Sequence, residues 1–213
     1  MAEGTKPLKE TNKTGIAIVL VMNVIVYYLA VKTDALLSAD YATIYKSVSE
    51  GVPAGLLLIL TSIVNAQISP ANKARIVFMR WDNPLPGSYA FTKYAHEDPR
   101  VDVSALEKKY NPLPTDPKDQ NRLWYKLYKT VEDEAAVLQV HREYLFSRDY
   151  NGIALLMLIG LGAAGFYQIP SLKTASLYLL ALLIQFLLTG QAARHHGKRF
   201  VTSVLARCAA REG

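Results

Sequence analysis

The four histidines of this 213-residue chain are the side chains best able to gain or lose a proton near neutral pH. His96 is followed by two carboxylates, His141 precedes an arginine and a glutamate, and His195 and His196 are adjacent in a basic stretch. None of them belongs to a Walker loop, GxSxG, HExxH, CxxC or EF-hand pattern. We therefore expect a solvated role for His96, a core or interface role for His141 and an interfacial role for the pair. The sequence predicts no enzyme activity, no catalytic residue, no cofactor and no metal site.

Four polar side chains in the apolar stretches of the chain are candidates for contacts between helices. They are Asn23, Thr61, Asn65 and Gln185. In a lipid environment, amides and hydroxyls bond across helices for about 0.6–2 kcal/mol each, so we expect interhelical polar contacts that stabilise a bundle or a subunit interface. The alternative is a polar path through an oligomer, lined by Asn23 and Gln185.

These residues lie in or beside four runs without any Asp, Glu, Lys, Arg or His, namely residues 15–31, 52–68, 152–167 and 175–190. A helix needs about 20 residues to cross a hydrocarbon core of about 30 Å, and the flanks of each run supply the missing residues. The sequence therefore predicts an all-α, polytopic membrane protein with four transmembrane helices and a small helical cytosolic insert between helices 2 and 3. Ion-coupled transport is disfavoured, because transporters keep ionisable groups inside the membrane.

The runs divide the chain into five predicted regions. In order, they are a cytoplasmic N-terminal tail (1–14), a first transmembrane hairpin (15–70) with an outer loop (32–51), a cytosolic helical domain (71–150), a second transmembrane hairpin (151–190) and a basic cytoplasmic tail (191–213). Lysine and arginine are concentrated in the tails and at both ends of the insert, which is the pattern of cytoplasmic segments. We expect a multi-pass protein of the bacterial inner membrane with both termini in the cytoplasm.

Small residues in the third run favour close helix packing. Gly160 and Ala164 form a small-xxx-small pair, which lets a second helix approach closely, either within the chain or in a homo-oligomer. In the outer loop, apolar residues at three- and four-residue spacing predict an amphipathic helix. The single cysteine, Cys208, excludes an intrachain disulfide.

The insert is predicted to consist of helices separated by proline-rich turns at residues 83–87 and 111–114. Asp102 is suited to cap a helix over residues 103–110, and Asp116, which a proline follows, to cap a helix over residues 117–129. From Glu132 the chain contains no proline or glycine before the third run begins. This predicts one long helix over residues 132–167.

Seven residues near these turns are candidates for contact with a protein partner, because aromatic and arginine side chains beside rigid turns are typical of interface anchors. They are Leu85, Tyr89, Phe91, Arg122, Trp124, Tyr125 and Tyr128. The alternative is that the domain buries these residues in its own core.

The net charge of +6 arises mainly outside the insert, whose residues 71–150 include 13 basic and 12 acidic side chains. Direct nucleic-acid binding is therefore not expected, whereas the basic tail favours contact with membrane lipids. The favoured function is an inner-membrane scaffold or sensor subunit that oligomerises and presents its helical domain to a cytosolic protein partner. The alternatives are a small pore-forming or membrane-disrupting effector of a toxin or anti-phage defence system, and a membrane enzyme acting on lipid with His141 or His96 as base.

Overall fold

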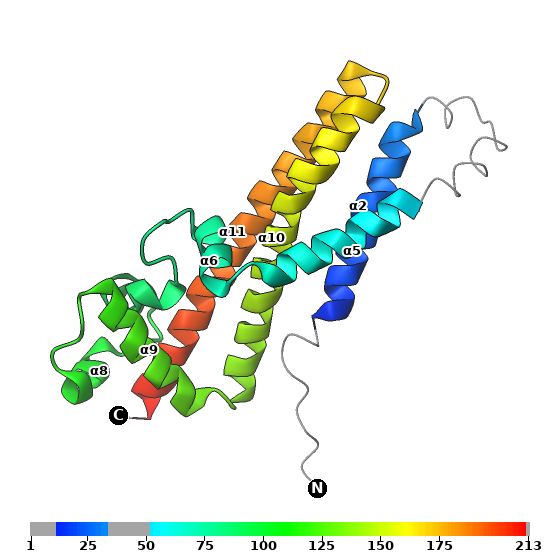
Figure 1. Cartoon of the computed structure of the whole chain (residues 1–213). Coiled ribbons are helices and arrows are strands. Elements are labelled where there is room, and N and C mark those ends of the chain that lie inside the picture. Colours follow the sequence, from blue (N-terminus) through cyan, green and yellow to red (C-terminus); the bar gives the residue numbers. More distant parts are fainter. Residues whose placement is uncertain (1–11, 34–51, 212–213) are drawn as a thin grey trace, which may run out of the picture. The chain divides into compact units, whose positions relative to one another are not determined.

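The computed structural model describes residues 12–33 and 52–211, with residues 52–58 described by their backbone alone. Within these ranges all regular structure is helical and no strand occurs, which confirms the predicted all-α class (Figure 1). Most of the predicted N-terminal tail and residues 34–51 of the predicted outer loop lie outside the described residues.

Among the described residues, three helices are long and apolar enough to cross a membrane, which suggests a membrane protein. They are α2 (Lys13–Val31), α10 (Ala135–Gln168) and α11 (Leu172–Ala210), with 19, 34 and 39 residues. The helix α5 (Val52–Gln67) has 16 residues and falls short of the length needed. It ends just before Pro70, whose ring disfavours helical geometry at the preceding residue. The structure thus supports three of the four predicted spans.

The described chain divides into two compact units. We call residues 70–148 and 190–211 the helical domain, and residues 12–33, 52–69 and 149–189 the membrane unit. The helical domain therefore includes the segment after residue 190, which the sequence predicted to be a separate basic tail. As far as Ala210 that segment is the end of α11.

The end of α11 joins the helical domain because it is amphipathic. Phe200, Val204 and Cys208 recur at four-residue spacing beside Val201 and Leu205, and all five are buried. This spacing forms one apolar stripe along a helix. Cys208 is consequently a buried free thiol in the domain core.

The other helices of the helical domain are short and follow the predicted breaks. They are α6 (Pro70–Phe78), the 3-10 turn η2 (Pro86–Tyr89), the π turn η3 (Ala90–Tyr94), α7 (Ala95–Glu97), α8 (Val103–Tyr110) and α9 (Pro117–Val131). Both predicted caps are confirmed: the Asp102 carboxylate accepts from Ala105 N at 3.0 Å, and that of Asp116 accepts from Lys118 N at 2.9 Å. The long helix predicted from residue 132 begins at Ala135 as α10.

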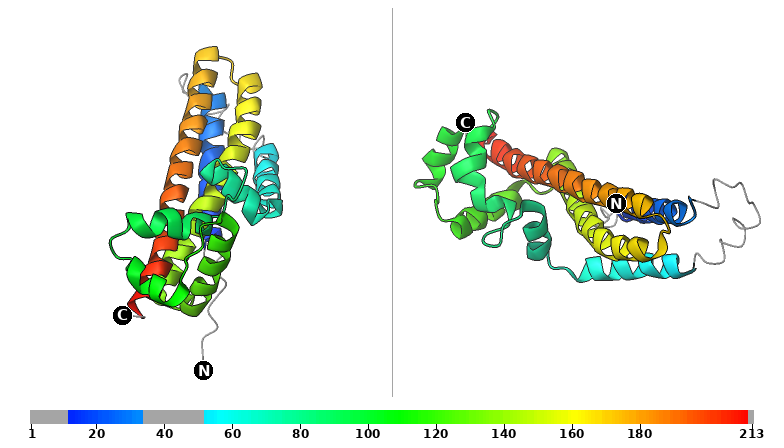
Figure 2. Two further views of the ribbon diagram at one scale, coloured as in Figure 1. Left: turned by 90° about the vertical axis from the view of Figure 1, so that its left-hand side faces the viewer. Right: turned by 90° about the horizontal axis from the view of Figure 1, so that it is seen from above.

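In the membrane unit, the second half of α10 and the first half of α11 run antiparallel side by side (Figure 2). Their shared core contains Ile153, Met157, Leu161 and Leu182, and Leu20 of α2 joins it. Many other large apolar side chains of this unit remain exposed, among them Ile25, Leu180 and Leu188. Such exposure is typical of helices that face lipid rather than water.

Candidate functional site

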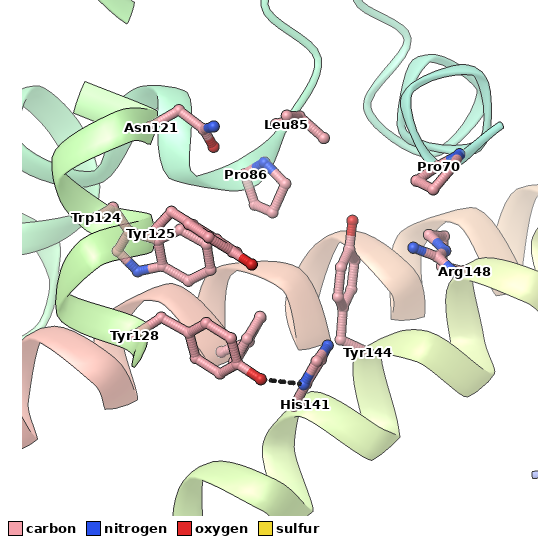
Figure 3. A pocket seen from close by; sticks show the side chains of 11 residues that line it. Pro70, Leu85, Pro86, Asn121, Trp124, Tyr125, Tyr128, His141, Tyr144 and Arg148 are labelled. Carbon is pink, nitrogen blue, oxygen red and sulfur yellow. Dashed lines mark hydrogen bonds between the residues drawn. The ribbon is translucent and has the colours of Figure 1, made fainter. Parts of the chain in front are cut away.

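An aromatic pocket of about 250 Å³ opens in the helical domain (Figure 3). Its lining residues come from α9, α10, α11 and the segments that begin α6 and η2, and are Pro70, Leu85, Pro86, Asn121, Trp124, Tyr125, Tyr128, His141, Tyr144, Arg148 and Phe200. Six of the eleven carry an aromatic or imidazole ring. An apolar or aromatic group is the natural occupant of such a lining.

Stacked rings form one wall of this pocket. The His141 imidazole lies parallel to the Phe200 ring, with centroids 4.4 Å apart, and Tyr128 stands edge-on to both. Tyr128 Oη and His141 Nδ1 share a hydrogen bond of 3.2 Å. Burial raises the pKa of the Tyr128 phenol above its ordinary value, so the hydroxyl stays neutral and able to donate. This packing, with His141 partly buried, agrees with the core or interface role expected for it.

Trp124 is fixed at the pocket by contacts on two sides. Its indole Nε1 donates to the carbonyl of Val201 on α11 at 3.4 Å. On the other side, the ring lies so close to Gly87 that a Cβ there would be 2.6 Å from Trp124 Cε3. The glycine at position 87 therefore allows η2 to approach α9 and to close this end of the pocket.

A buried amide that the sequence reasoning missed connects α9 to the π turn. Gln120 is 1% exposed, and its Oε1 accepts hydrogen bonds from Phe91 N at 3.0 Å and Thr92 N at 3.1 Å. Its Nε2 donates to the Thr115 carbonyl at 2.8 Å. The available signal was the position of Gln120 one turn before Trp124, on the apolar face of α9.

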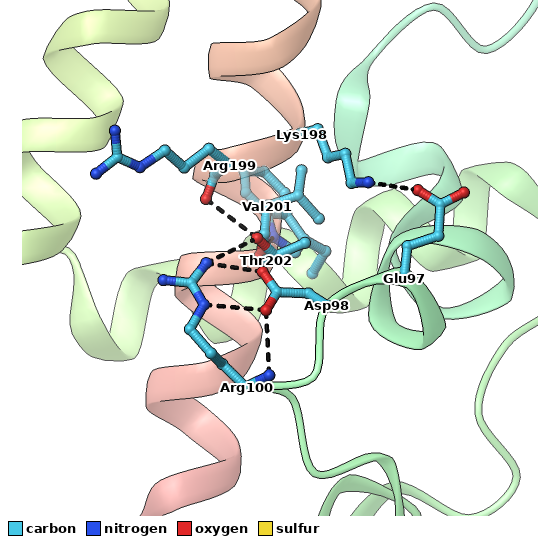
Figure 4. Close-up of polar contacts among 8 residues, drawn as sticks. Glu97, Asp98, Arg100, Lys198, Arg199, Val201 and Thr202 are labelled. Carbon is cyan, nitrogen blue, oxygen red and sulfur yellow. Dashed lines mark hydrogen bonds and ion pairs between the residues drawn. The ribbon is translucent and has the colours of Figure 1, made fainter.

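A polar cluster attaches the loop after α7 to α11 (Figure 4). The Arg100 guanidinium donates to both carboxylate oxygens of Asp98, at 2.7 and 2.9 Å, and one of its nitrogens also reaches Thr202 Oγ1 at 3.4 Å. The hydrogen bonds from Arg100 hold the pKa of Asp98 well below its usual range. Nearby, Lys198 and Glu97 form an ion pair of 2.7 Å. His96 is exposed, as expected.

The predicted partner-interface residues divide into two groups. Phe91, Trp124 and Tyr128 are buried, with 2%, 6% and 9% exposure, so the alternative of a domain core holds for them. Arg122 and Tyr125 are exposed on α9, and Leu85 and Tyr89 are partly buried. Leu85 and Tyr125 remain at the pocket, where an approaching group could touch them.

The pocket lining contains no carboxylate, serine, threonine or cysteine among the described residues. In the ranges that the structure describes, no group of three or more His, Cys, Asp and Glu could hold a metal ion. His196 lies 3.5 Å from Glu143, a carboxylate that Arg199 also contacts at 3.4 Å. His195, His196 and His141 are not assembled around a shared group.

The polar residues predicted for interhelical contacts differ in their hydrogen-bond partners and in their burial. Gln185 of α11 donates to Tyr150 Oη of α10 at 3.0 Å, which is a contact of the predicted kind. Asn23 instead donates to Val19 O of its own helix at 2.9 Å. Thr61 and Asn65 are both buried, at 8% exposure.

Asn151 is the principal interhelical amide of the membrane unit, and the sequence reasoning did not identify it. It is fully buried, and its Nδ2 donates to Phe186 O at 2.9 Å and to Thr189 Oγ1 at 3.1 Å, both on α11. It precedes the third charge-free run by one residue, beside Tyr150 and Asp149. An amide adjacent to the first residue of an apolar run was the available signal.

Close packing of α10 on α11 uses glycines other than the predicted pair. A Cβ at Gly162 would lie 3.0 Å from Leu179 Cδ1, and one at Gly165 would lie 3.0 Å from Tyr178 Cδ1. At Gly160 a Cβ would meet nothing within 4 Å, and Ala164 is only partly buried. The faces differ because Gly162 and Gly165 are three residues apart on the side toward α11, whereas Gly160 lies on another side of the helix.

A second pocket, of about 360 Å³, lies within the membrane unit. Its lining brings Asn23 of α2 together with Gln185 of α11 and with Tyr150 and Tyr178. The two amides named as candidate liners of a polar path therefore share one pocket. The remainder of the lining is largely aliphatic.

Comparisons of the chain with protein families, with curated proteins and with solved structures find no match. The class that the structure defines is an all-α protein with three candidate membrane-spanning helices and a helical domain that contains an aromatic pocket.

Proposed function

We propose that this chain is a membrane-anchored scaffold or sensor subunit whose helical domain binds a protein partner through the aromatic pocket. The pocket is the observation that carries this proposal. Its lining is rich in tryptophan and tyrosine, the residue types that contribute most binding energy at protein interfaces. A volume of about 250 Å³ is small for a cofactor and suits one or two inserted apolar side chains of a partner.

The composition of the pocket supports binding rather than catalysis. Its described lining has one imidazole, which is stacked on Phe200 and bonded to Tyr128, and no nucleophile or carboxylate beside it. Nucleophilic catalysis needs a nucleophile that a neighbouring base activates, and a general base must reach the proton that it abstracts, whereas His141 Nδ1 already shares a hydrogen bond with Tyr128. This arrangement makes the lipid-enzyme alternative the weakest of the three functions.

The fold of the helical domain supports placing its two chain segments on the same side of the membrane. Residues 70–148 and 190–210 share one hydrophobic core, so they must lie in the same compartment. Lysine and arginine are concentrated at both segments, which favours the cytoplasm by the positive-inside rule. We propose a cytoplasmic helical domain in a bacterial inner membrane, with α5 and its flanks as a fourth span.

We also propose that the membrane unit forms a homo-oligomer through the Gly160 and Ala164 face of α10. The open space at Gly160 supports this assignment, because no described atom of the chain lies within 4 Å of a Cβ added there. Small residues on a free helix face let a second copy approach closely in lipid.

Co-purification from mild detergent tests the partner proposal. Deleting the whole insert is unsuitable, because α10 and α11 supply part of its core. The informative variant is Tyr125→Ala, since Tyr125 lies at the pocket with 51% exposure. We expect at least about a tenfold loss of partner recovery, which equals about 1.4 kcal/mol.

The matched control is Lys126→Ala, because Lys126 is the next residue on α9, is exposed and does not line the pocket. This variant should retain the partner at the level of the unaltered chain. Equal recovery with Tyr125→Ala and with Lys126→Ala would overturn the pocket assignment.

A pore-forming effector is the second candidate function, and the pocket shared by Asn23 and Gln185 is the observation that favours it. Its test is the membrane potential of cells after induced expression. Under this alternative, the chain collapses the potential and Gln185→Leu reduces the effect. An unchanged potential after induction would exclude this function.

A further inference from the structure

Two apolar side chains stand exposed directly after α6, in a domain that buries nearly all its other large apolar groups. Met79 is 63% exposed and Trp81 is 84% exposed. Exposed pairs of this kind on an otherwise well-buried domain mark a contact with another apolar surface. The segment between α6 and η2 is therefore a candidate interaction surface that the aromatic pocket does not include.

The backbone of this segment is held in an unusual conformation. Met79 and Asn83 have φ values of 51° and 46°, in the left-handed region that asparagine adopts readily and methionine rarely. Such conformations persist only where the surrounding structure enforces them, and they are concentrated at functional sites. The segment from Met79 to Asn83 is thus bounded by two left-handed residues, of which Met79 has the conformation that its surroundings must enforce.

Two arginines hold this segment in place, Arg75 through the main chain and Arg80 through a ring contact. Arg75 Nε donates to the Trp81 carbonyl at 3.1 Å, and the Arg80 guanidinium lies over the Tyr89 ring at 4.2 Å. Because Trp81 is anchored through its carbonyl, its indole can project outward without disturbing the fold. Arg80 packs inward between two side chains that both project outward.

Contacts at the end of α6, just before this segment, fix which part of α11 lies beside it. Arg194 Nη1 donates to the Val77 carbonyl at 2.7 Å, and a Cβ at Gly197 would lie 2.8 Å from the Phe78 ring. Met79 follows Phe78 directly in the chain. The exposed pair therefore lies near the part of α11 that contains Arg194 and Gly197.

Arg194 marks the end of the charge-free part of α11. Residues 174–193 contain no charged side chain, and these 20 residues rise about 30 Å, the thickness of a hydrocarbon core. The headgroup layer adds about 5–8 Å on each side of that core. A segment in contact with Arg194 consequently lies at headgroup level if the charge-free part crosses the bilayer.

We propose that Met79 and Trp81 insert into the lipid headgroup region, so that the segment after α6 is a membrane-contacting surface of the helical domain. Tryptophan is favoured at this depth because its ring is apolar and its N–H is polar. The charges near the segment also suit an anionic lipid surface, since the partly exposed Arg75, Arg80 and Arg194 accompany a single acid, Asp82. This inference does not depend on a partner bound in the pocket.

Tryptophan fluorescence tests this proposal, because the chain has only two tryptophans. The variant Trp124→Phe leaves Trp81 as the sole reporter, in the full chain reconstituted in phosphatidylcholine–phosphatidylglycerol vesicles. Lipids brominated near the start of the acyl chain should lower its emission by about twofold, because the quencher then lies at the depth of the ring. Aqueous iodide should have little effect.

The matched control is Trp81→Phe, which leaves the buried Trp124 and should be insensitive to both quenchers. If Trp124→Phe does not fold, the difference between the unaltered chain and Trp81→Phe gives the same signal. Quenching of Trp81 by iodide and not by brominated lipid would overturn the proposal. Protection of Trp81 from both quenchers would also overturn it, because a protein, such as a second copy of this chain, would then cover the ring.

Discussion

The helical domain and the membrane unit are both built from amphipathic or apolar helices, yet they distribute their apolar side chains in opposite ways. Among the described residues, the large exposed apolar side chains of the helical domain are Met79, Trp81 and Tyr125. The membrane unit exposes many more, on α2, α5, α10 and α11. The surface of the helical domain suits water and that of the membrane unit suits hydrocarbon, because only a lipid environment tolerates so large an exposed apolar surface.

The contrast also explains the two proposals. In a domain whose surface faces water, the few exposed apolar side chains are exceptions, and we expect each to contact a partner or lipid. Tyr125 lies at the aromatic pocket, where a protein partner is proposed, and Met79 and Trp81 lie where lipid is proposed. In the membrane unit, the corresponding exceptions are buried polar groups such as Asn151.

The largest expected effect comes from removing a buried ring of the helical domain. Trp124→Ala should lower the free energy of unfolding by about 3–5 kcal/mol, because it leaves a cavity beside Phe200 and Tyr128. The control Leu180→Ala, in the membrane unit, removes a side chain that is 50% exposed and should change stability by less than about 0.5 kcal/mol in vesicles. Chemical unfolding followed by circular dichroism measures both. Equal losses would break the contrast between the two units.

A smaller loss of stability is expected from removing the buried amide of Asn151 in the membrane unit. Asn151→Ala removes two hydrogen bonds to α11 and should destabilise the unit by about 1–2 kcal/mol. Asn23→Ala is the matched control, because the Asn23 amide donates to Val19 O of its own helix, and its removal should change thermal stability in detergent very little. A larger loss for Asn23 than for Asn151 would show that the amide of α2 has the structural role.

The smallest effect concerns pH and the Asp98–Arg100 pair. Because the pKa of Asp98 is lowered in the folded chain, the carboxylate stabilises the fold above its unfolded pKa of about 3.9, and this stabilisation is lost as the pH falls below that value. Asp98→Asn should cost about 1 kcal/mol at pH 7, since Arg100 is largely exposed and solvent screens the pair.

Melting temperatures of the unaltered chain and of Asp98→Asn, recorded between pH 7 and pH 3, test this sign. The difference should shrink as the solution becomes acid, because Asp98 of the unfolded chain then binds a proton that the folded chain does not bind. Lys129→Gln is a useful control, since its ion pair with Glu132 lies away from this cluster. A difference that grows toward pH 3 would contradict the assigned direction.

Local sequence signals predicted the helical segments well and the site only in part. The caps at Asp102 and Asp116 and the long proline-free stretch before residue 152 were readable, because each depends on residues within a few positions of one another. Gln120 and Asn151 were missed, since a polar residue on an apolar face has a role only once its distant partner is known. The predicted interface residues on α9 were correctly placed on one short helix, but their burial was not predictable.

The amino-acid sequence by itself determined the all-α class, the breaks between helices and the charge-free runs, because these follow from local backbone preferences and from transfer between water and lipid. Only the tertiary structure decided that the segment after residue 190 completes the helical domain, that Gly162 and Gly165 rather than Gly160 approach α11, and that His141 stacks on Phe200. These features join residues far apart in the chain. Which distant faces meet depends on how all the side chains pack together, and no single stretch of sequence contains that information.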